Sequence, residues 1–298
     1  MAATSPSYPT RESGAESRGI VVACSPGGRP GSPDEPTCQT PSVLRAVILD
    51  LDGTLVDHHG AVMEAVSAML STVGRSATDV EALRKTWWEL ERRHMDEYLA
   101  GACTFAEQRR RRLRTYLPLL GQPVPPDLHD LDAWFVEHYL GAYEDAWRLY
   151  PDVGPCLRTL RDSAASPRLA VLTNGDGAQQ RAKVARFQLR SDLDAVLVSE
   201  EIGVAKPDPV AFLRVCERLG VEPSQAVSVG DWLEGDAVAA HRAGLTGIWL
   251  DRGLDPRTGL PTAPGIADGL PITRIGGLGE LSPMLSVLTN TQVGAQPP

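Results

Sequence analysis

Two acidic residues, Asp50 and Asp52, stand two positions apart and are followed by Gly53. A carboxylate can attack a substrate as a nucleophile, transfer a proton or bind a hard cation, so paired carboxylates are candidates for catalysis. We interpret the apolar run before them, 43–49, as a buried parallel strand. Ligands bind at the carboxyl ends of strands in open α/β sheets, so this spacing favours a functional site. The alternative is an ordinary acidic turn, which Asp and Gly also favour.

Further polar residues follow other predicted strands. Short apolar runs typical of buried strands occur at 168–173, 195–199, 226–230 and 247–250. Thr173 and Asn174 stand at the end of the first of these runs, and Lys206 follows the second after a short loop. Asp231 directly follows the third run, and Asp236 comes shortly after it. These residues extend the candidate site beyond the first two carboxylates.

The order of strands and helices indicates the fold class. Helical patterns lie between the strands, at 155–163, 178–187, 209–219 and 235–243. This β-α-β order predicts an α/β fold, with a Rossmann-like parallel sheet covered by helices on both faces. Residues 61–148 break the order because they have helical apolar spacing and no convincing strand. We therefore expect an inserted α-helical domain there.

The domain boundaries follow from these patterns. We expect the α/β core to comprise residues 42–60 and 149–281, on either side of the helical insert at 61–148. Residues 1–41 are rich in Pro, Gly, Ser and Thr and lack apolar periodicity, which predicts a disordered leader. Residues 282–298 are predicted to form a flexible tail.

The composition excludes several classes of partner. The chain has 298 residues, a formal net charge of -9 at pH 7 and a pI near 5.2, which argues against nucleic acid or an anionic membrane as a partner. No apolar run approaches the length of a membrane span. The five cysteines are scattered, which favours neither a zinc site nor a disulfide framework. We expect a cytoplasmic protein, whose oligomeric state the sequence leaves open. An alternative start of translation near Val43 would remove the leader.

In combination, the four polar segments resemble the motifs of the haloacid dehalogenase superfamily, most of whose members are phosphatases. Residues resembling the first to the fourth motif are, in order, 50–57, 172–175, 205–208 and 229–236. The resemblance covers residues 44–250. The insert between the first two motifs resembles the helical-cap branch of the superfamily. Residues 172–183 and 198–207 also resemble acylneuraminate-9-phosphatases and pyrimidine 5'-nucleotidases.

The resemblance implies a reaction in two steps. Asp50 would attack the phosphorus and form an aspartyl-phosphate, which splits one hard step into two. Asp52 would protonate the leaving alkoxide and later deprotonate the attacking water. This double role requires one carboxyl to be charged and its neighbour to be protonated, which mutual repulsion favours. Dehalogenases of this superfamily use a lone nucleophilic Asp, so the presence of Asp52 favours phosphoryl chemistry.

Magnesium is the cofactor that the resemblance implies. Mg²⁺ prefers oxygen ligands, few carboxylates and several waters. Asp50, the backbone carbonyl of Asp52 and Asp231 would bind it, whereas Asp236 would support its water shell.

The remaining motif residues would contact the phosphate. The Thr173 hydroxyl would donate to a phosphate oxygen, with the Asn174 amide beside it. Lys206 would neutralise charge on Asp50 and on the transferring phosphoryl group. Asp57 and Asp208 are expected to be helix caps rather than catalytic groups.

A run of arginines in the insert, Arg109 to Arg112 and then Arg114, has two interpretations. Four consecutive residues spread around a helix axis, and Glu107 is nearby, so a solvated helix face is the simpler expectation. The alternative is that one of these arginines reaches a phosphate or a carboxylate of the substrate.

These features predict a magnesium-dependent phosphatase that hydrolyses a small phosphomonoester metabolite through an aspartyl-phosphate intermediate. A phosphomutase of the same fold would use both aspartates and return the phosphoryl group to a second hydroxyl. A non-catalytic regulatory or binding protein is the alternative from another class. Trp232 stands where many relatives carry Ser or Thr, so the substrate of neither phosphatase subgroup is transferred to this chain.

Overall fold

The structure, a computed structural model, describes residues 43–74, 77–255, 259–263, 265 and 269–286. These residues all fall within one compact unit, Pro41–Pro298. The expected leader and the last residues of the expected tail lie outside the described residues. Residues 281–286 are helical, and Leu281 and Leu285 are buried in the main core. The packed chain therefore extends beyond residue 281, where we expected the α/β core to end.

The strands form one six-stranded parallel sheet in the order β3-β2-β1-β4-β5-β6. Their bounds are β1 Ala46–Leu49, β2 Arg168–Thr173, β3 Ala195–Val198, β4 Ala226–Gly230, β5 Thr246–Leu250 and β6 Thr273–Ile275. The five strands expected from the apolar runs are all present, which confirms the predicted parallel sheet. Strand β6 was not predicted, because it has only three residues and no apolar run marks it.

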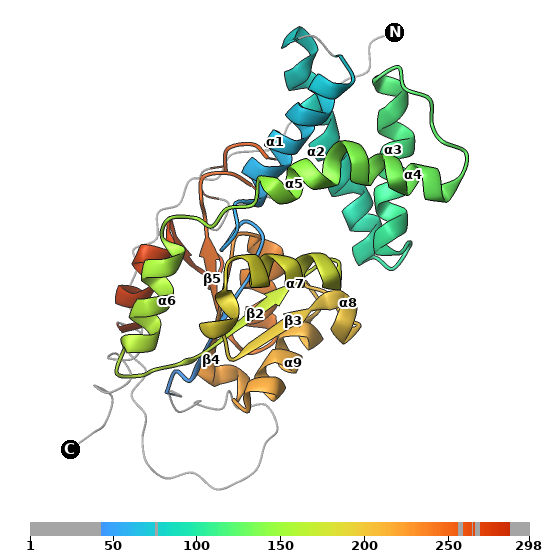
Figure 1. Cartoon of the computed structure of the whole chain (residues 1–298). Coiled ribbons are helices and arrows are strands. Elements are labelled where there is room, and N and C mark those ends of the chain that lie inside the picture. Colours follow the sequence, from blue (N-terminus) through green and yellow to red (C-terminus); the bar gives the residue numbers. More distant parts are fainter. Residues whose placement is uncertain (1–42, 75–76, 256–258, 264, 266–268, 287–298) are drawn as a thin grey trace, which may run out of the picture. The chain divides into compact units, whose positions relative to one another are not determined.

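Helices cover both faces of the sheet (Figure 1). Val47 and Leu49 of β1 enter the core on one face, whereas Ala46 and Ile48 enter the core on the other, as the two-residue period of a strand requires. The helices that pack into the first core are α6 (Val153–Asp162) and α7 (Gly177–Arg186), and those in the second are α9 (Pro209–Leu219) and α10 (Ala239–Arg242). Shorter elements are α8 (Ser199–Ile202), η2 (Leu189–Ser191), η3 (Pro223–Gln225), η4 (Leu233–Val238) and η5 (Leu278–Glu280).

The insert between β1 and β2 is helical, as expected, and we call it the cap. Its elements are α1 (His58–Thr72), α2 (Ala77–Leu99), α3 (Phe105–Leu119), α4 (Leu128–Phe135), η1 (Val136–Leu140) and α5 (Gly141–Asp145). The cap has its own aromatic core, in which the rings of Trp87 and Tyr116 meet edge to face at 4.9 Å between centroids. The helical region begins slightly before the expected boundary at residue 61, because Asp57 caps α1 by accepting a hydrogen bond from Gly60 N.

The two segments that join the cap to the core, 55–57 and 148–150, run side by side. Val56 and Leu149 form an antiparallel bridge, flanked by two backbone hydrogen bonds of 3.0 Å. Arg148 adds an ion pair with the Asp57 carboxylate at 2.8 Å. The entry and the exit of the cap are therefore held together directly.

None of the helices in the described ranges combines the length and the apolar character needed to cross a membrane. Helix α2 is 23 residues long, but it carries charged side chains along its whole length.

Candidate active site

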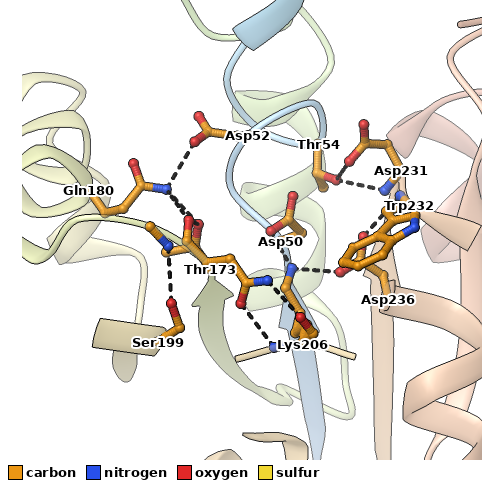
Figure 2. Close-up of polar contacts among 12 residues, drawn as sticks. Asp50, Asp52, Thr54, Thr173, Gln180, Ser199, Lys206, Asp231, Trp232 and Asp236 are labelled. Atoms are coloured by element: carbon orange, nitrogen blue, oxygen red, sulfur yellow. Dashed lines mark hydrogen bonds and ion pairs between the residues drawn. The ribbon is translucent and has the colours of Figure 1, made fainter. Parts of the chain in front are cut away.

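The site lies where the strand order of the sheet reverses. From β1 the chain continues to β2 and β3 on one side and then crosses to β4 on the other. Crevices at such a reversal are where α/β sheets bind ligands. Asp50 follows β1 and donates its backbone N–H to the carbonyl of Val229 in β4 at 2.9 Å. Thr173 ends β2 and Asp231 follows β4, and Figure 2 shows their side chains around Asp50.

Gly53 allows the first loop to pass close to the loop after β4. Its φ of +86° lies in the left-handed region, and a Cβ atom there would lie 2.1 Å from Oδ2 of Asp231. Any larger residue would displace the Asp231 carboxylate. The glycine after Asp52 is therefore required by the approach of the two loops.

Three buried carboxylates, those of Asp50, Asp231 and Asp236, form one group. One oxygen atom from each lies within 4.8 Å of the others, and none of the three residues is more than 9% exposed. Lys206 reaches into the group, with Nζ 2.5 Å from Oδ1 of Asp50 and 2.6 Å from Oδ1 of Asp236. The structure thus brings together four of the residues that the sequence placed at separate strand ends.

This group carries more negative than positive charge. Burial raises the pKa of Asp50 to about 7 and the pKa of Asp231 well above its ordinary value. The neighbouring carboxylates add to both increases, and Lys206 opposes them. Added positive charge at this position would therefore stabilise the ionised carboxylates.

Asn174 holds the loop that carries Lys206. Its Nδ2 donates to the carbonyl oxygen of Lys206 at 2.8 Å, and its Oδ1 accepts from the Lys206 backbone N–H at 2.9 Å. We expected the Asn174 amide to lie beside the Thr173 hydroxyl at the phosphate. In the structure Asn174 lines the same cavity as Thr173, and its side chain fixes the backbone of the residue whose ammonium group contacts Asp50.

Two residues of α7 that the sequence analysis did not identify hold Asp52. Lys183 Nζ lies 2.7 Å from both carboxylate oxygens, and Gln180 Nε2 donates to Oδ2 at 2.9 Å. Gln180 also donates to Oγ1 of Thr173 at 2.6 Å. Both side chains are almost fully buried. Their three-residue spacing on the helix after the second motif was the only signal in the sequence that could have identified them.

The expected roles require Asp52 to be protonated and Asp50 to be ionised at the start of the reaction. The pKa values of the two carboxyls differ in the opposite direction. Burial raises the pKa of Asp52, but the charges of Lys183 and His58 and the hydrogen bonds from α7 outweigh it, so the pKa is lowered. Asp50 is the carboxyl with the raised pKa. The physical reason is that Asp52 has a buried ammonium group to itself, whereas Asp50 shares Lys206 with Asp236.

A cavity of about 210 Å³ lies between this edge of the sheet and the cap. Core residues at the cavity include Asp50, Asp52 and Thr173, and the cap contributes polar and aromatic side chains. Cap residues that line the cavity include His58, Glu91, Gln108, Arg109 and Arg112.

The arginine run of α3 divides between the surface and the interior. Arg110, Arg111 and Arg114 form ion pairs with partly exposed acidic residues, as expected for a solvated face. For Arg112 this expectation is wrong, because its side chain is only 5% exposed and is paired with Glu91. Sequence alone did not separate these residues, because the position of the neighbouring helices decides which side of α3 is covered.

Comparison with known proteins identifies the family. Residues 44–244 match the haloacid dehalogenase-like hydrolases. The chain is 30% identical over 207 residues to ribulose-1,5-bisphosphate 5-phosphatase from Halopiger xanaduensis, a match that covers 69% of this chain and 84% of the relative. It is 40% identical over 112 residues to glyceraldehyde 3-phosphate phosphatase from Methanopyrus kandleri, covering 36% of this chain and 47% of the relative. It is 38% identical over 115 residues to N-acylneuraminate-9-phosphatase from Mus musculus, covering 38% and 45%. The chain therefore spans about half the length of the last two relatives.

Solved structures share the fold. YfnB, a HAD-hydrolase from Bacillus subtilis whose crystal structure contains magnesium, has a TM-score of 0.65 at 21% identity, covering 82% of this chain and 99% of that one. A 2-haloacid dehalogenase from Pseudomonas syringae pv. Tomato has a TM-score of 0.56 at 27% identity, with the same coverage. The family match confirms the resemblance to the superfamily, the relative from Mus musculus confirms the resemblance to acylneuraminate-9-phosphatases, and the solved structures confirm the parallel sheet with a helical cap. The chain belongs to the haloacid dehalogenase-like hydrolases.

Proposed function

We propose that this protein is a magnesium-dependent phosphatase that hydrolyses a small phosphomonoester through an aspartyl-phosphate intermediate. One observation carries the proposal: the two carboxylates of one turn have separate environments. Asp50 faces the carboxylate group and Lys206, whereas Asp52 is held by α7. A nucleophile and a proton-transfer group are therefore available side by side.

The residues at the first carboxylate fit a hard divalent cation. Three buried carboxylates face one lysine, which contacts two of them, and burial together with the neighbouring carboxylates raises the pKa values of Asp50 and Asp231. Asp50, the backbone carbonyl of Asp52 and Asp231 would hold Mg²⁺, and Asp236 would support its waters. The ion would supply the positive charge that lets an anionic nucleophile approach a phosphate.

Asp50 carries the first step. Its carboxylate oxygen attacks the phosphorus, the bond from phosphorus to the ester oxygen breaks, and the phosphoryl group becomes bound to Asp50. Lys206 and the Thr173 hydroxyl stabilise the negative charge on the transferring oxygens. Asn174 contributes by fixing the backbone of Lys206.

Asp52 transfers the protons. Because its pKa is lowered, Asp52 must first take up a proton from solvent. It donates that proton to the leaving alkoxide and then accepts one from the water that attacks the phosphorus, which breaks the bond to Asp50 and releases phosphate. Lys183 and Gln180 stabilise the carboxylate form of Asp52. This is the form that exists after the alcohol has left and that accepts the proton of water.

Phosphoryl chemistry is favoured over dehalogenation, although the family contains both activities. Displacement of a halide needs no proton donor, and here a second carboxylate is held in place by two buried partners. The relatives that match this chain over most of their length include a sugar phosphatase. The cavity of about 210 Å³ suits a small metabolite.

The test is phosphate release from a panel of small phosphomonoesters with Mg²⁺, with EDTA and with the Asp50→Asn variant. We expect release that stops with EDTA, returns with excess Mg²⁺, and falls by about 10³-fold or more in the variant. Mass spectrometry of acid-quenched wild-type reactions should detect a phosphoryl adduct on the peptide that contains Asp50.

Two results would contradict the proposal. Isomerised product without free phosphate would indicate a phosphomutase. No turnover of any phosphate ester by protein whose circular dichroism spectrum indicates folding would favour the non-catalytic alternative.

A further inference from the structure

One arginine of α3 differs from its neighbours in its partners. Arg110, Arg111, Arg112 and Arg114 each form an ion pair with a carboxylate. Among the residues that the structure describes, no carboxylate lies within ion-pair distance of Arg109. Its guanidinium donates one hydrogen bond, from Nη2 to the side-chain oxygen of Gln179 in α7 at 3.2 Å. The guanidinium group has five N–H donors, so most of its donor capacity is available.

Helix geometry directs Arg109 to the cavity. Phe105, Gln108, Arg109 and Arg112 have the spacing i, i+3, i+4 and i+7, which places them on one face of α3, and all four line the cavity. Arg109 lies 4.6 Å from the ring centroid of Phe105, which supports the guanidinium from the cap side. The residue therefore belongs to the cavity wall.

The other charged cap residues at the cavity are paired with one another. Glu91 forms ion pairs with Arg112 and with His58. Arg92 lies 4.0 Å from a carboxylate oxygen of Asp96. In the part of the cap that the structure describes, Arg109 is thus the cavity-lining cation without an acidic partner.

The electrostatic surroundings of Arg109 agree with this. Burial and the charge of Arg112 lower the pKa of Arg109, and the charge of Asp176, which forms no ion pair with it, opposes them; hydrogen bonds to acidic side chains raise the pKa values of Arg110 and Arg111. A guanidinium group remains charged in proteins, so Arg109 places a partly desolvated positive charge at the wall. An anion in the cavity would compensate this charge.

We propose that Arg109 binds an oxyanion on the alcohol portion of the substrate, so that the substrate class is short phosphomonoesters carrying a second anionic group. The inference rests on the proposed phosphatase function. The planar fork of a guanidinium matches carboxylate and phosphate oxygens, and such hydrogen bonds are strong where water is excluded. Asp50, which the reacting phosphate would approach, and Arg109 line the same cavity of about 210 Å³, so one small substrate can contact both. Oε1 of the neighbouring Gln108 is buried without a partner among the described residues, and it would accept a donor from the same substrate.

The experiment compares three probes that share a primary phosphate: 2-phosphoglycolate, 2-hydroxyethyl phosphate and 1,3-propanediol bisphosphate. The first carries a carboxylate, the second replaces it with an uncharged hydroxymethyl group, and the third carries a second phosphate. For each anionic probe, the measured quantity is the ratio of its kcat/KM to that of the neutral probe. We expect the larger of the two wild-type ratios to identify the preferred oxyanion. In Arg109→Gln this ratio should fall by about 10- to 100-fold.

Two further variants separate binding from packing. Arg109→Lys keeps the charge but loses the fork, so its ratio should lie between those of the wild type and Arg109→Gln. Arg110→Gln removes a charge on the solvated side of the same helix, where the partner is Asp132, and should retain the wild-type ratio. Thermal melting of each variant reports whether the cap is still folded.

The outcomes are distinct. No phosphate release from any of the three probes or from the wider panel by the wild type would overturn the proposed function. Release with equal losses of kcat/KM for anionic and neutral probes in Arg109→Gln would overturn the inference and leave the proposed function standing. A ratio that falls for one anion alone assigns that anion to Arg109.

Discussion

The edge of the sheet and the wall of the cap arrange charge in opposite ways. At the sheet edge, carboxylates of like charge are crowded around Lys206, and the pKa of Asp50 rises to about 7. In the cap, Glu91 forms an ion pair with the buried Arg112, and the pKa of Glu91 falls to about 2. Crowded carboxylates favour the binding of a cation, whereas a carboxylate paired with a guanidinium is costly to leave without its partner. Changes at the sheet edge should therefore affect turnover, and changes in the cap should affect stability and substrate choice.

The largest expected effect is on turnover. Asp52→Asn removes the proton-transfer group while keeping a side chain of similar size, and we expect kcat to fall by about 10²- to 10⁴-fold. In burst kinetics the loss should be smaller for p-nitrophenyl phosphate, whose leaving group needs no proton, than for an alkyl phosphate. Equal losses of the burst rate for both substrates would contradict the role of Asp52 as general acid.

Breaking the buried pair in the cap should reduce stability. Arg112→Met leaves the Glu91 carboxylate without its guanidinium partner, and we expect the free energy of unfolding in urea to fall by about 3 kcal/mol. Arg110→Met, whose partner Asp132 is partly exposed, is the matched control and should cost less than about 1 kcal/mol. Similar losses in both variants would show that burial of the pair does not matter.

Lys183 links the helix α7 to Asp52 and should act mainly on kcat. Lys183→Met removes the ammonium group that contacts both oxygens of Asp52, and we expect kcat to fall by about 10- to 100-fold with little change in KM. Arg181→Met, on the same helix and paired with Glu201 near the surface, is the control. A change confined to KM would indicate that Lys183 binds substrate instead of positioning Asp52.

The smallest effect concerns acid sensitivity. The folded-state pKa of Glu91 lies below its ordinary value, so its contribution to stability is present above about pH 4.5 and is lost as the pH falls towards 2. Urea unfolding of the wild type should therefore lose stability over this interval more steeply than Arg112→Met does. Parallel pH profiles for the two proteins would show that Arg112 does not cause the low pKa of Glu91.

The sequence predicted the sheet because strand cores are continuous apolar runs, and it predicted the residues at their ends because the motifs are local. It missed Lys183 and Gln180 because their partner Asp52 is remote in the chain. It assigned Arg112 to a solvated face because α2 and α4, which pack against α3, determine which side of that helix is covered. The relative acidity of Asp50 and Asp52 also required the structure, since it depends on which lysine each carboxylate shares.

The paired segments 55–57 and 148–150 make the cap an exchangeable module on a single stem. Because its two ends are already hydrogen-bonded to each other, the distance that a replacement must span is fixed by the stem and not by the size of the insert. A helical insert of another length, grafted at this stem, would leave β1 and α6 where they are. The same catalytic edge could in this way be given a new substrate without altering any residue that performs the reaction.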